Sequence, residues 1–415
     1  MVRNWAGNIE YSTSDVRRPQ SLAELRELVA SSPRVRAMGS RHSFSTVVDT
    51  TGVLVSTQDL GLTAEIDAGR GVAVVPGAAT YAEVGALLQQ HGWALPNTGS
   101  LPHISMAGAC ATGTHGSGIR NGCLPTAVEA IEMVCADGEL VTLGVDDADF
   151  PGAVVSLGSL GVVTRLNLRI EPTYDVAQHV LLDVPSEVVT ESGAELLGSA
   201  YSVSLFTTFA RPDTVDSVWR KHRTDQGPSP SESWGGRTAE HAVHPIVGLD
   251  ASAATEQLGH PGPWHERLPH FRSAFTPSVG DELQSEFLLP IEALGDVWPR
   301  LCEESDRFKN ALQVMEVRTV AADRMWLSPF HERDTLALHV TWVSDWARVQ
   351  PALAALEDIV APYDPRPHWG KVFTAWDAER IAAAYPLLPR FRELAERLDP
   401  EGCFTNEYVR SLGVR

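Results

Sequence analysis

The chain has 415 residues, of which 43% are hydrophobic and 21% are charged, so its apolar material suffices for roughly two or three packed domains. Acidic residues outnumber basic ones by 53 to 33, which gives a formal net charge of −20 at pH 7. This balance argues against binding of nucleic acid or of an anionic membrane surface, although a few local donors can still hold an anionic cofactor.

The five cysteines are odd in number and include no C-x-x-C pair, which argues against a disulfide framework and against a structural zinc site. Residues 1–11 lack the charged and then apolar segments of a secretory signal. No apolar run approaches the roughly 20 residues that span a bilayer. We therefore expect a cytoplasmic protein in a reducing compartment, with no membrane partner and no metal.

Short strands alternate with capped helices over the first 95 residues. Ser21 and Thr80 each stand three residues before a glutamate at the start of a helical apolar pattern, which is the spacing of a capping box. Gly92 marks the end of the second helix. Strands are expected at residues 35–38, 53–56 and 71–75. The alternation predicts an α/β or α+β region.

The segment 39–45, Gly-Ser-Arg-His-Ser-Phe-Ser, follows the first of these strands directly. A small polar turn after a strand presents backbone N–H groups in a concave arrangement that suits a phosphate or pyrophosphate. His42, at its centre, could contact the bound ligand or be joined to it. The segment taken alone favours a simpler interpretation, an ordinary turn with a surface histidine.

Residues 97–118 are rich in glycine and hydroxyl side chains and poor in bulky ones. Such a stretch cannot fill a core by itself, but it lets the backbone approach a large flat ligand closely. We favour a ligand-lining segment over a glycine-rich surface loop. The spacing of Gly113, Gly116 and Gly118 does not match the dinucleotide pattern G-x-G-x-x-G, which argues against a Rossmann fold.

A hairpin is expected next, because strands at 130–135 and 140–143 flank the turn signal Asp137-Gly138. Residues 158–170 contain a further strand, and Glu171-Pro172 ends the region. We place a domain boundary near residue 173.

Two strands of the second half carry polar side chains among apolar ones. Glu316 and Arg318 share a face of the strand 312–320, and His339 and Thr341 share a face of the strand 336–343. Lys371 follows a Pro-Arg-Pro linker. Several buried ionisable groups are expected together mainly where they pair or act on a ligand, so we favour a polar pocket. The alternative is a Glu316–Arg318 ion pair, with His339 on a solvated face and Lys371 at a loop tip.

The five histidines of residues 241–270 lack metal-binding spacing.

Several motifs together resemble the covalent flavoprotein oxidases of the vanillyl-alcohol-oxidase fold and, within them, the alditol (xylitol, sorbitol) oxidases. The matching stretches span nearly the whole chain: GSRHSFS at 39–45, LPHIS at 101–105, AGACATGTHGSG at 107–118, SLGVVT at 159–164, PGPWHERLPHF at 261–271, EVRTVAAD at 316–323, LHVTWV at 338–343, HWGKVF at 368–373 and FTN at 404–406.

The resemblance implies an α+β fold with three parts. Residues 1–172 would form a PCMH-type FAD-binding domain of two subdomains. Residues 173–398 would form a substrate (cap) domain with a large antiparallel sheet and flanking helices. Residues 399–415 would return to the FAD-binding domain.

The resemblance also implies FAD attached covalently through His42. Gly39, Ser40, Arg41 and Ser43 would bind its pyrophosphate. The further residues implied to contact the cofactor are Ser100, Ser105, Gly108, Thr112, Gly113, His115, Gly116, Gly161, Val163 and Lys371. The residues implied for the substrate are Ser100, Glu316, Arg318, Thr341 and Lys371.

The implied reaction oxidises the terminal primary alcohol of an alditol to the aldose, with hydride transfer to flavin N5 and reoxidation by O2 to H2O2. We expect His339 to accept the hydroxyl proton, and Arg318 and Lys371 to stabilise developing negative charge. Glu316 and Ser100 would hold the other hydroxyls. Gly99, where this family often has alanine, could alter oxygen access or substrate room.

The implied partners are a small polyol and O2, and we expect a monomer. Three other interpretations stay open at this point. They are an aldonolactone oxidase or dehydrogenase of the same fold, a non-catalytic sugar- or flavin-binding protein, and, more distantly, a metal hydrolase.

Overall fold

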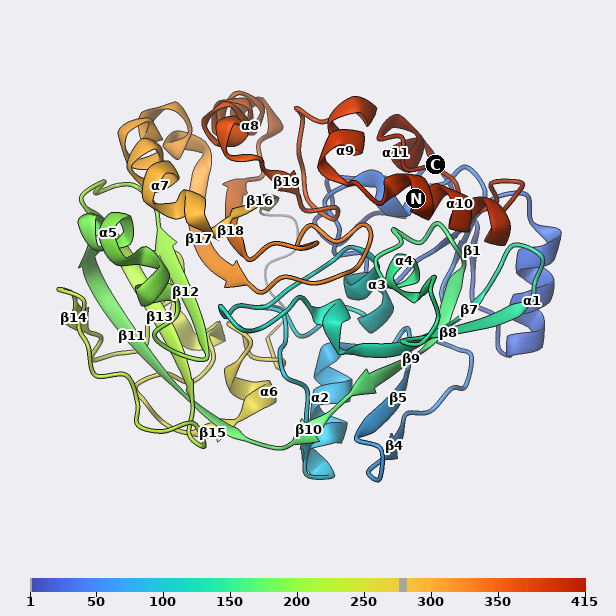
Figure 1. Ribbon diagram of the computed structural model, residues 1–415, viewed down its shortest axis with the longest axis horizontal. Coiled ribbons are helices and arrows are strands. Elements are labelled where there is room, and N and C mark those ends of the chain that lie inside the picture. The colour runs from blue at the N-terminus through green and yellow to red at the C-terminus, as the bar shows by residue number, and fades with distance from the viewer. Residues whose placement is uncertain (1, 276–281) are drawn as a thin grey trace.

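The computed structural model describes residues 2–275 and 282–415, and it contains two sheet-based halves that lie side by side (Figure 1). The first half holds a small parallel sheet in the order β1 (Val16–Arg17), β3 (Val53–Val55), β2 (Val35–Ala37). It also holds an antiparallel sheet in the order β4 (Glu65–Asp67), β5 (Val72–Pro76), β9 (Val162–Arg169), β7 (Val128–Val134), β8 (Leu140–Gly144). A two-stranded pair, β6 (Trp93–Ala94) and β10 (Glu171–Pro172), lies beside them.

Both helices expected in the first 95 residues are present, as α1 (Leu22–Ser31) and α2 (Tyr81–Gln90). The Thr80 hydroxyl accepts the Glu83 N–H at 3.2 Å, and the Glu83 carboxylate accepts the Thr80 N–H at 2.8 Å, which completes the capping box. At α1 the Glu24 carboxylate accepts the N–H of Gln20 instead, one residue before the cap.

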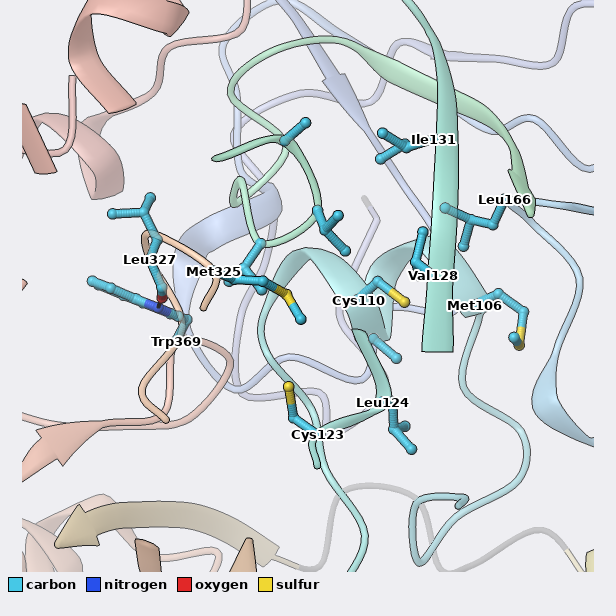
Figure 2. Packing of buried hydrophobic residues seen from close by; sticks show 14 of the residues in the cluster. Met106, Cys110, Cys123, Leu124, Val128, Ile131, Leu166, Met325, Leu327 and Trp369 are labelled. Atoms are coloured by element: carbon cyan, nitrogen blue, oxygen red, sulfur yellow. Dashed lines mark hydrogen bonds between the residues drawn. The ribbon is translucent and has the colours of Figure 1, made fainter. Parts of the chain in front are cut away.

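The glycine-rich segment 97–118 contains a short helix, α3 (Met106–Ala111), which the sequence analysis did not anticipate. Met106, Ala109 and Cys110 are buried, and their spacing of three and four residues places them on one helical face. Figure 2 shows Met106 and Cys110 in one apolar cluster with Val128 and Ile131 of β7. The helix therefore anchors one face in the core and leaves small residues on its other side.

The second half is built on one large sheet. Among the described residues it has nine strands, eight of them in the order β14 (Arg237–Thr238), β11 (Asp175–Pro185), β13 (Thr214–Arg223), β12 (Ser202–Thr207), β17 (Leu312–Val320), β18 (Thr335–Val343), β16 (Glu282–Pro290), β19 (Arg366–Pro367). The ninth, β15 (Gly262–Pro263), pairs with β11. All neighbouring pairs are antiparallel. The predicted α+β fold with a large antiparallel sheet and flanking helices is confirmed.

The two faces of this sheet differ in chemistry. Three helices, α5 (Ser186–Leu197), α7 (Leu294–Glu303) and α8 (Trp346–Val360), lie over one face at the upper left of Figure 1. Their apolar side chains pack with Met315 and Val317 of β17 and Leu338 and Val340 of β18. Because strand side chains alternate, the residues between these point to the opposite face, which is polar and turns towards the first half.

The C-terminal helices α9 (Ala378–Ala384), α10 (Leu388–Leu398) and α11 (Glu407–Ser411) lie beside the N-terminal strands in Figure 1. Val35 donates its N–H to the Cys403 carbonyl at 2.9 Å. The buried guanidinium of Arg36 donates to four backbone carbonyls, those of Val47, Leu157, Gly158 and Phe404. These hydrogen bonds hold the last residues of the chain against the first strands and against the turn that precedes β9.

All five cysteines are free thiols, and four of them are buried. Among the described residues, no helix combines the length and the apolar character needed to cross a membrane.

Candidate active site

A cavity of about 460 Å³ lies between the first half and the polar face of the large sheet. The first half contributes most of the residues predicted to hold the cofactor: Gly39, Ser40, Arg41, His42, Ser43, Ser100, Ser105, Gly108, Thr112, His115, Gly161 and Val163. The sheet and the loop after β19 contribute the residues predicted to hold the substrate: Glu316, Arg318, His339, Thr341 and Lys371. The fold thus brings together groups that are far apart in the sequence.

Two glycines of the predicted cofactor set, Gly113 and Gly116, are not among the residues that line this cavity. Gly113 has a positive φ of 68°, a turn conformation that side chains rarely adopt. A Cβ on Gly116 would lie 2.3 Å from the Asn97 side chain and 2.4 Å from the Thr98 carbonyl. Both glycines are therefore required by backbone geometry and close packing.

The cradle formed by residues 39–43 is held by a reciprocal pair of serines. The Ser105 N–H donates to Ser40 Oγ at 3.0 Å, and the Ser40 N–H donates to Ser105 Oγ at 3.3 Å. A Cβ on Gly39 would lie 2.3 Å from Ser105 Oγ, so only glycine permits this approach. Arg41 turns the chain with a positive φ of 63°. The pairing brings the backbone of the loop close to the start of α3 at the cavity wall.

His42 is held in the cavity wall by an aromatic partner. The indole of Trp5 stacks on its imidazole, with ring centroids 5.0 Å apart and planes 21° apart. His42 Nδ1 is buried, and no group in residues 2–275 or 282–415 makes a hydrogen bond to it. Burial, with a contribution from the charge of Lys371, lowers the pKa of His42 to about 4, so the ring is neutral. A neutral imidazole keeps a lone pair that can form a bond.

These features fit a large, flat, anionic cofactor. Glycine and serine backbone lines one wall, and Gly108 and Gly161 keep other parts of the wall free of side chains. The buried Nδ1 of His42 lacks a partner that a bound cofactor would supply. The described residues contain no group of His, Cys, Asp or Glu placed to hold a metal ion.

Arg318 lies in a buried charge network that includes a residue the sequence analysis missed, Glu286 of β16. One Glu286 oxygen accepts from Arg318 Nη2 at 2.7 Å and lies 2.9 Å from His115 Nε2. The other ring nitrogen of His115 lies 2.8 Å from the Gly116 carbonyl. Both ring nitrogens of His115 therefore face oxygen atoms that can accept a hydrogen bond. Arg318 Nη1 also donates to Ser100 Oγ at 3.4 Å.

A second missed residue, Gln284, links His339 to Lys371. Its amide nitrogen donates to the Glu282 carboxylate, which fixes its oxygen as the acceptor for Lys371 Nζ. The same oxygen lies 3.1 Å from His339 Nε2. His339 therefore carries its proton on Nε2, and Nδ1 holds the lone pair. Nδ1 lies 4.0 Å from Glu316 Oε2.

The sequence contained a signal for both missed residues. In the segment 282–287, Glu-Leu-Gln-Ser-Glu-Phe, acidic and amide side chains alternate with other residues, as on β17 and β18. The period of two places Glu282, Gln284 and Glu286 on the polar face.

The alternative with His339 on a solvated face is contradicted, because its side chain is 12% exposed and lines the cavity. The Glu316–Arg318 ion pair of that alternative is present, at 3.5 Å.

Gly99 also lines the cavity. A Cβ there would meet Ile104 Cδ1 at 3.4 Å, an ordinary contact distance, so the wall has room for an alanine.

Acidification from about pH 7 to about pH 5 is expected to lower the melting temperature of the protein. Burial lowers the pKa of His42 and His270 to about 4 and that of His339 and His368 to about 3, from 6.5. Below pH 6.5 these histidines bind protons in the unfolded chain but not in the folded chain. Their contribution to the free energy of unfolding is therefore fully present above pH 6.5 and decreases as the pH falls. Calorimetry across this range checks the direction, and an unchanged or higher melting temperature in acid would contradict it.

Comparisons with known proteins bear on both halves of the cavity. Residues 14–144 match the family described as FAD binding domain, and residues 282–412 match the family described as D-arabinono-1,4-lactone oxidase. The chain is 47% identical to an alditol oxidase of Streptomyces sp., over 99% of this chain and 98% of that one.

More distant relatives also match this chain over nearly its full length. An L-gulono-1,4-lactone dehydrogenase of Mycobacterium tuberculosis is 28% identical, over 99% of this chain and 98% of that one. Among solved structures, a cholesterol oxidase from B. sterolicum superposes with a TM-score of 0.80 at 13% identity, over 99% of this chain and 96% of that one. That likeness shows a shared fold.

Proposed function

The chain belongs to the alditol oxidase family of FAD-dependent oxidoreductases, and from this premise we propose that it oxidises the terminal primary alcohol of alditols such as xylitol and sorbitol to the aldose. O2 is the electron acceptor and H2O2 the second product. The observation that carries the proposal is the meeting of His339, Arg318 and Lys371 across one cavity from the cradle at residues 39–43. We further propose a monomer divided into residues 1–172, 173–398 and 399–415.

FAD is the cofactor, and its covalent attachment through His42 is part of our proposal. The buried and unpartnered Nδ1 of a neutral ring supports it, as does the stack of Trp5, which holds the imidazole plane. The cradle around Gly39 and Ser40 would hold the pyrophosphate through backbone N–H groups. When bound, FAD supplies the two-electron chemistry, accepting a hydride from the carbinol carbon and passing the electrons to O2.

His339 Nδ1 would accept the proton of the reacting hydroxyl. Burial lowers the pKa of His339 to about 3, so the ring is neutral and the Nδ1 lone pair is available at physiological pH. A weak base suffices, because the hydroxyl becomes far more acidic as the hydride leaves the neighbouring carbon. Gln284 holds the ring in the tautomer that this role needs.

Arg318 and Lys371 would stabilise negative charge that develops on the substrate oxygen and on the cofactor. Burial lowers the pKa of Lys371 to about 8, which leaves its ammonium protonated at neutral pH. Ser100, Glu316 and Thr341 line the same cavity and would hydrogen-bond the remaining hydroxyls of the polyol.

The proposal is tested by comparing xylitol and sorbitol with L-gulono-1,4-lactone as substrates of the holoprotein. We expect kcat/KM, followed by H2O2 release, to favour the alditols by about tenfold or more, since a site built for several hydroxyls discriminates strongly. The second candidate, an aldonolactone oxidase, is favoured by the family match at residues 282–412. A higher kcat/KM for the lactone would replace our proposal with that candidate.

A further inference from the structure

A buried lysine and a buried histidine stand behind Glu316, on elements that the proposed mechanism does not use. Lys221 lies on β13 and is 1% exposed, and His270 lies in the loop after α6 (Trp264–Arg267) and is 5% exposed. His270 Nε2 lies 2.7 Å from Glu316 Oε1, and Lys221 Nζ lies 3.0 Å from His270 Nδ1. The three side chains form one continuous row, of which both His270 and Glu316 line the cavity.

The row is held firmly at its outer end. Lys221 Nζ donates to the carbonyls of Leu268 and Pro269, the two residues that precede His270. The rings of Phe206 and Trp219 meet the imidazole edge-to-face, with centroids 5.4 Å and 5.3 Å away. The plane of the His270 ring is therefore set by packing as well as by hydrogen bonds.

The donors and acceptors assign the proton on His270. The Glu316 carboxylate has no proton to donate, because the charge of Arg318 holds its pKa well below its usual range, so the nitrogen that faces it must donate and Nδ1 accepts from Lys221. The neutral ring then carries its proton on Nε2, which donates to Glu316 Oε1. Burial lowers the pKa of His270 to about 4, in agreement with a neutral ring.

The contacts on Glu316 are unequal. His270 and the guanidinium of Arg318 both face Oε1, at 2.7 Å and 3.5 Å. Oε2 lies on the side of His339, 4.0 Å from its Nδ1. Because these contacts hold Oε1 in place, Oε2 of Glu316 points in a fixed direction.

We propose that Lys221 and His270 are positioning residues that hold Glu316 so that Oε2 receives the polyol hydroxyls remote from the reacting carbon. This inference rests on the proposed alditol oxidase function. Two observations favour it over a purely structural role. Burying an amino group costs free energy, and burial accordingly lowers the pKa of Lys221 to about 7, whereas methionine would fill the same space without that cost. The row also ends on a side chain that lines the cavity.

The test uses holoenzyme variants and two substrates, xylitol and the short diol propane-1,2-diol, which lacks the remote hydroxyls. In H270N the amide can still bond Lys221 but does not reach Glu316. In H270Q the amide nitrogen can take the place of Nε2 and donate to Glu316. We expect H270N and K221M to raise KM for xylitol about tenfold with a smaller change in kcat, and H270Q to stay within about twofold.

Comparing xylitol with the diol distinguishes a loss of Glu316 positioning from a general loss of activity. If the row acts through Glu316, the ratio of kcat/KM for xylitol to that for the diol falls in H270N and K221M. A loss that is equal for both substrates, or the same in H270Q as in H270N, would overturn the inference. H222Q is the matched control, because His222 is the neighbour of Lys221 on β13, points to the opposite face and bonds the Gly227 carbonyl at 2.8 Å.

The inference and the proposed function fail in different ways. A wild-type protein whose flavin is not reduced by any alditol would defeat the function. A wild-type protein that alditols reduce, with variants that keep the wild-type substrate ratio, would defeat only the inference. Should K221M not fold, the comparison of H270N with H270Q still decides the outcome.

Discussion

Flavin is expected to leave the protein completely when the His42→Ala variant is precipitated with acid, whereas the wild-type pellet stays yellow. A carbon–nitrogen bond survives acid and denaturant, but hydrogen bonds and stacking do not. The expectation rests on the neutral ring of His42, its buried and unpartnered Nδ1, and its stack on Trp5 at the cavity wall. Absorbance of the redissolved pellet and of the supernatant measures the two fractions.

His103→Ala is the matched control for this experiment. His103 is near enough that its charge lowers the pKa of His42, but it bonds the Ser273 carbonyl at 2.8 Å and does not line the cavity. Its variant should keep the flavin in the pellet. A yellow pellet from His42→Ala would show that the covalent link lies at another residue.

Replacing Lys371 with methionine is expected to slow anaerobic reduction of the flavin by xylitol by about 10² to 10³-fold, the usual cost of removing one charge-stabilising donor. The ammonium is buried in the cavity and donates to Gln284, beside the ring proposed as the base. Methionine retains the volume and removes the charge. Stopped-flow absorbance gives the reduction rate, and the flavin content, measured after unfolding, should stay unchanged.

The pH dependence of the same rate provides an independent check on Lys371. Burial lowers its pKa from 10.5 to about 8, so in the wild type the ammonium is lost as the pH rises through about 8. The wild-type rate should therefore fall on the alkaline side, and Lys371→Met should lack that fall. A variant that reduces at the wild-type rate would remove Lys371 from the mechanism.

Much of the architecture could be predicted from local patterns. The capping box at Thr80 forms as the spacing indicates, because its hydrogen bonds join residues three apart. Glu316 and His339 face the same cavity because each lies at a position of polar alternation on its strand. Gly113 and Gly116, predicted to contact the cofactor, lie outside the cavity lining, and a glycine required for a turn or for close packing looks the same in a sequence as one that admits a ligand.

Other features depend on contacts between distant parts of the chain. Lys221 and His270 are 49 positions apart, and His270 and Glu316 are 46 apart. No periodicity links these residues, so only the folded chain brings them into one row. The tautomers of His270 and His339 likewise follow from the acceptors beside them, the Glu316 carboxylate at His270 and the Gln284 amide oxygen at His339.

The sequence by itself determined the alternation of short strands and capped helices, the polar alternation on the sheet strands and the small-residue cradle around His42, because these are set by residue type and short spacing. The tertiary structure decided which of these groups meet. It placed Glu286 against Arg318 and His115, and it directed each ring nitrogen of His339. The physical reason is that burial and hydrogen-bond partners, which set charge and proton position, are properties of the packed chain.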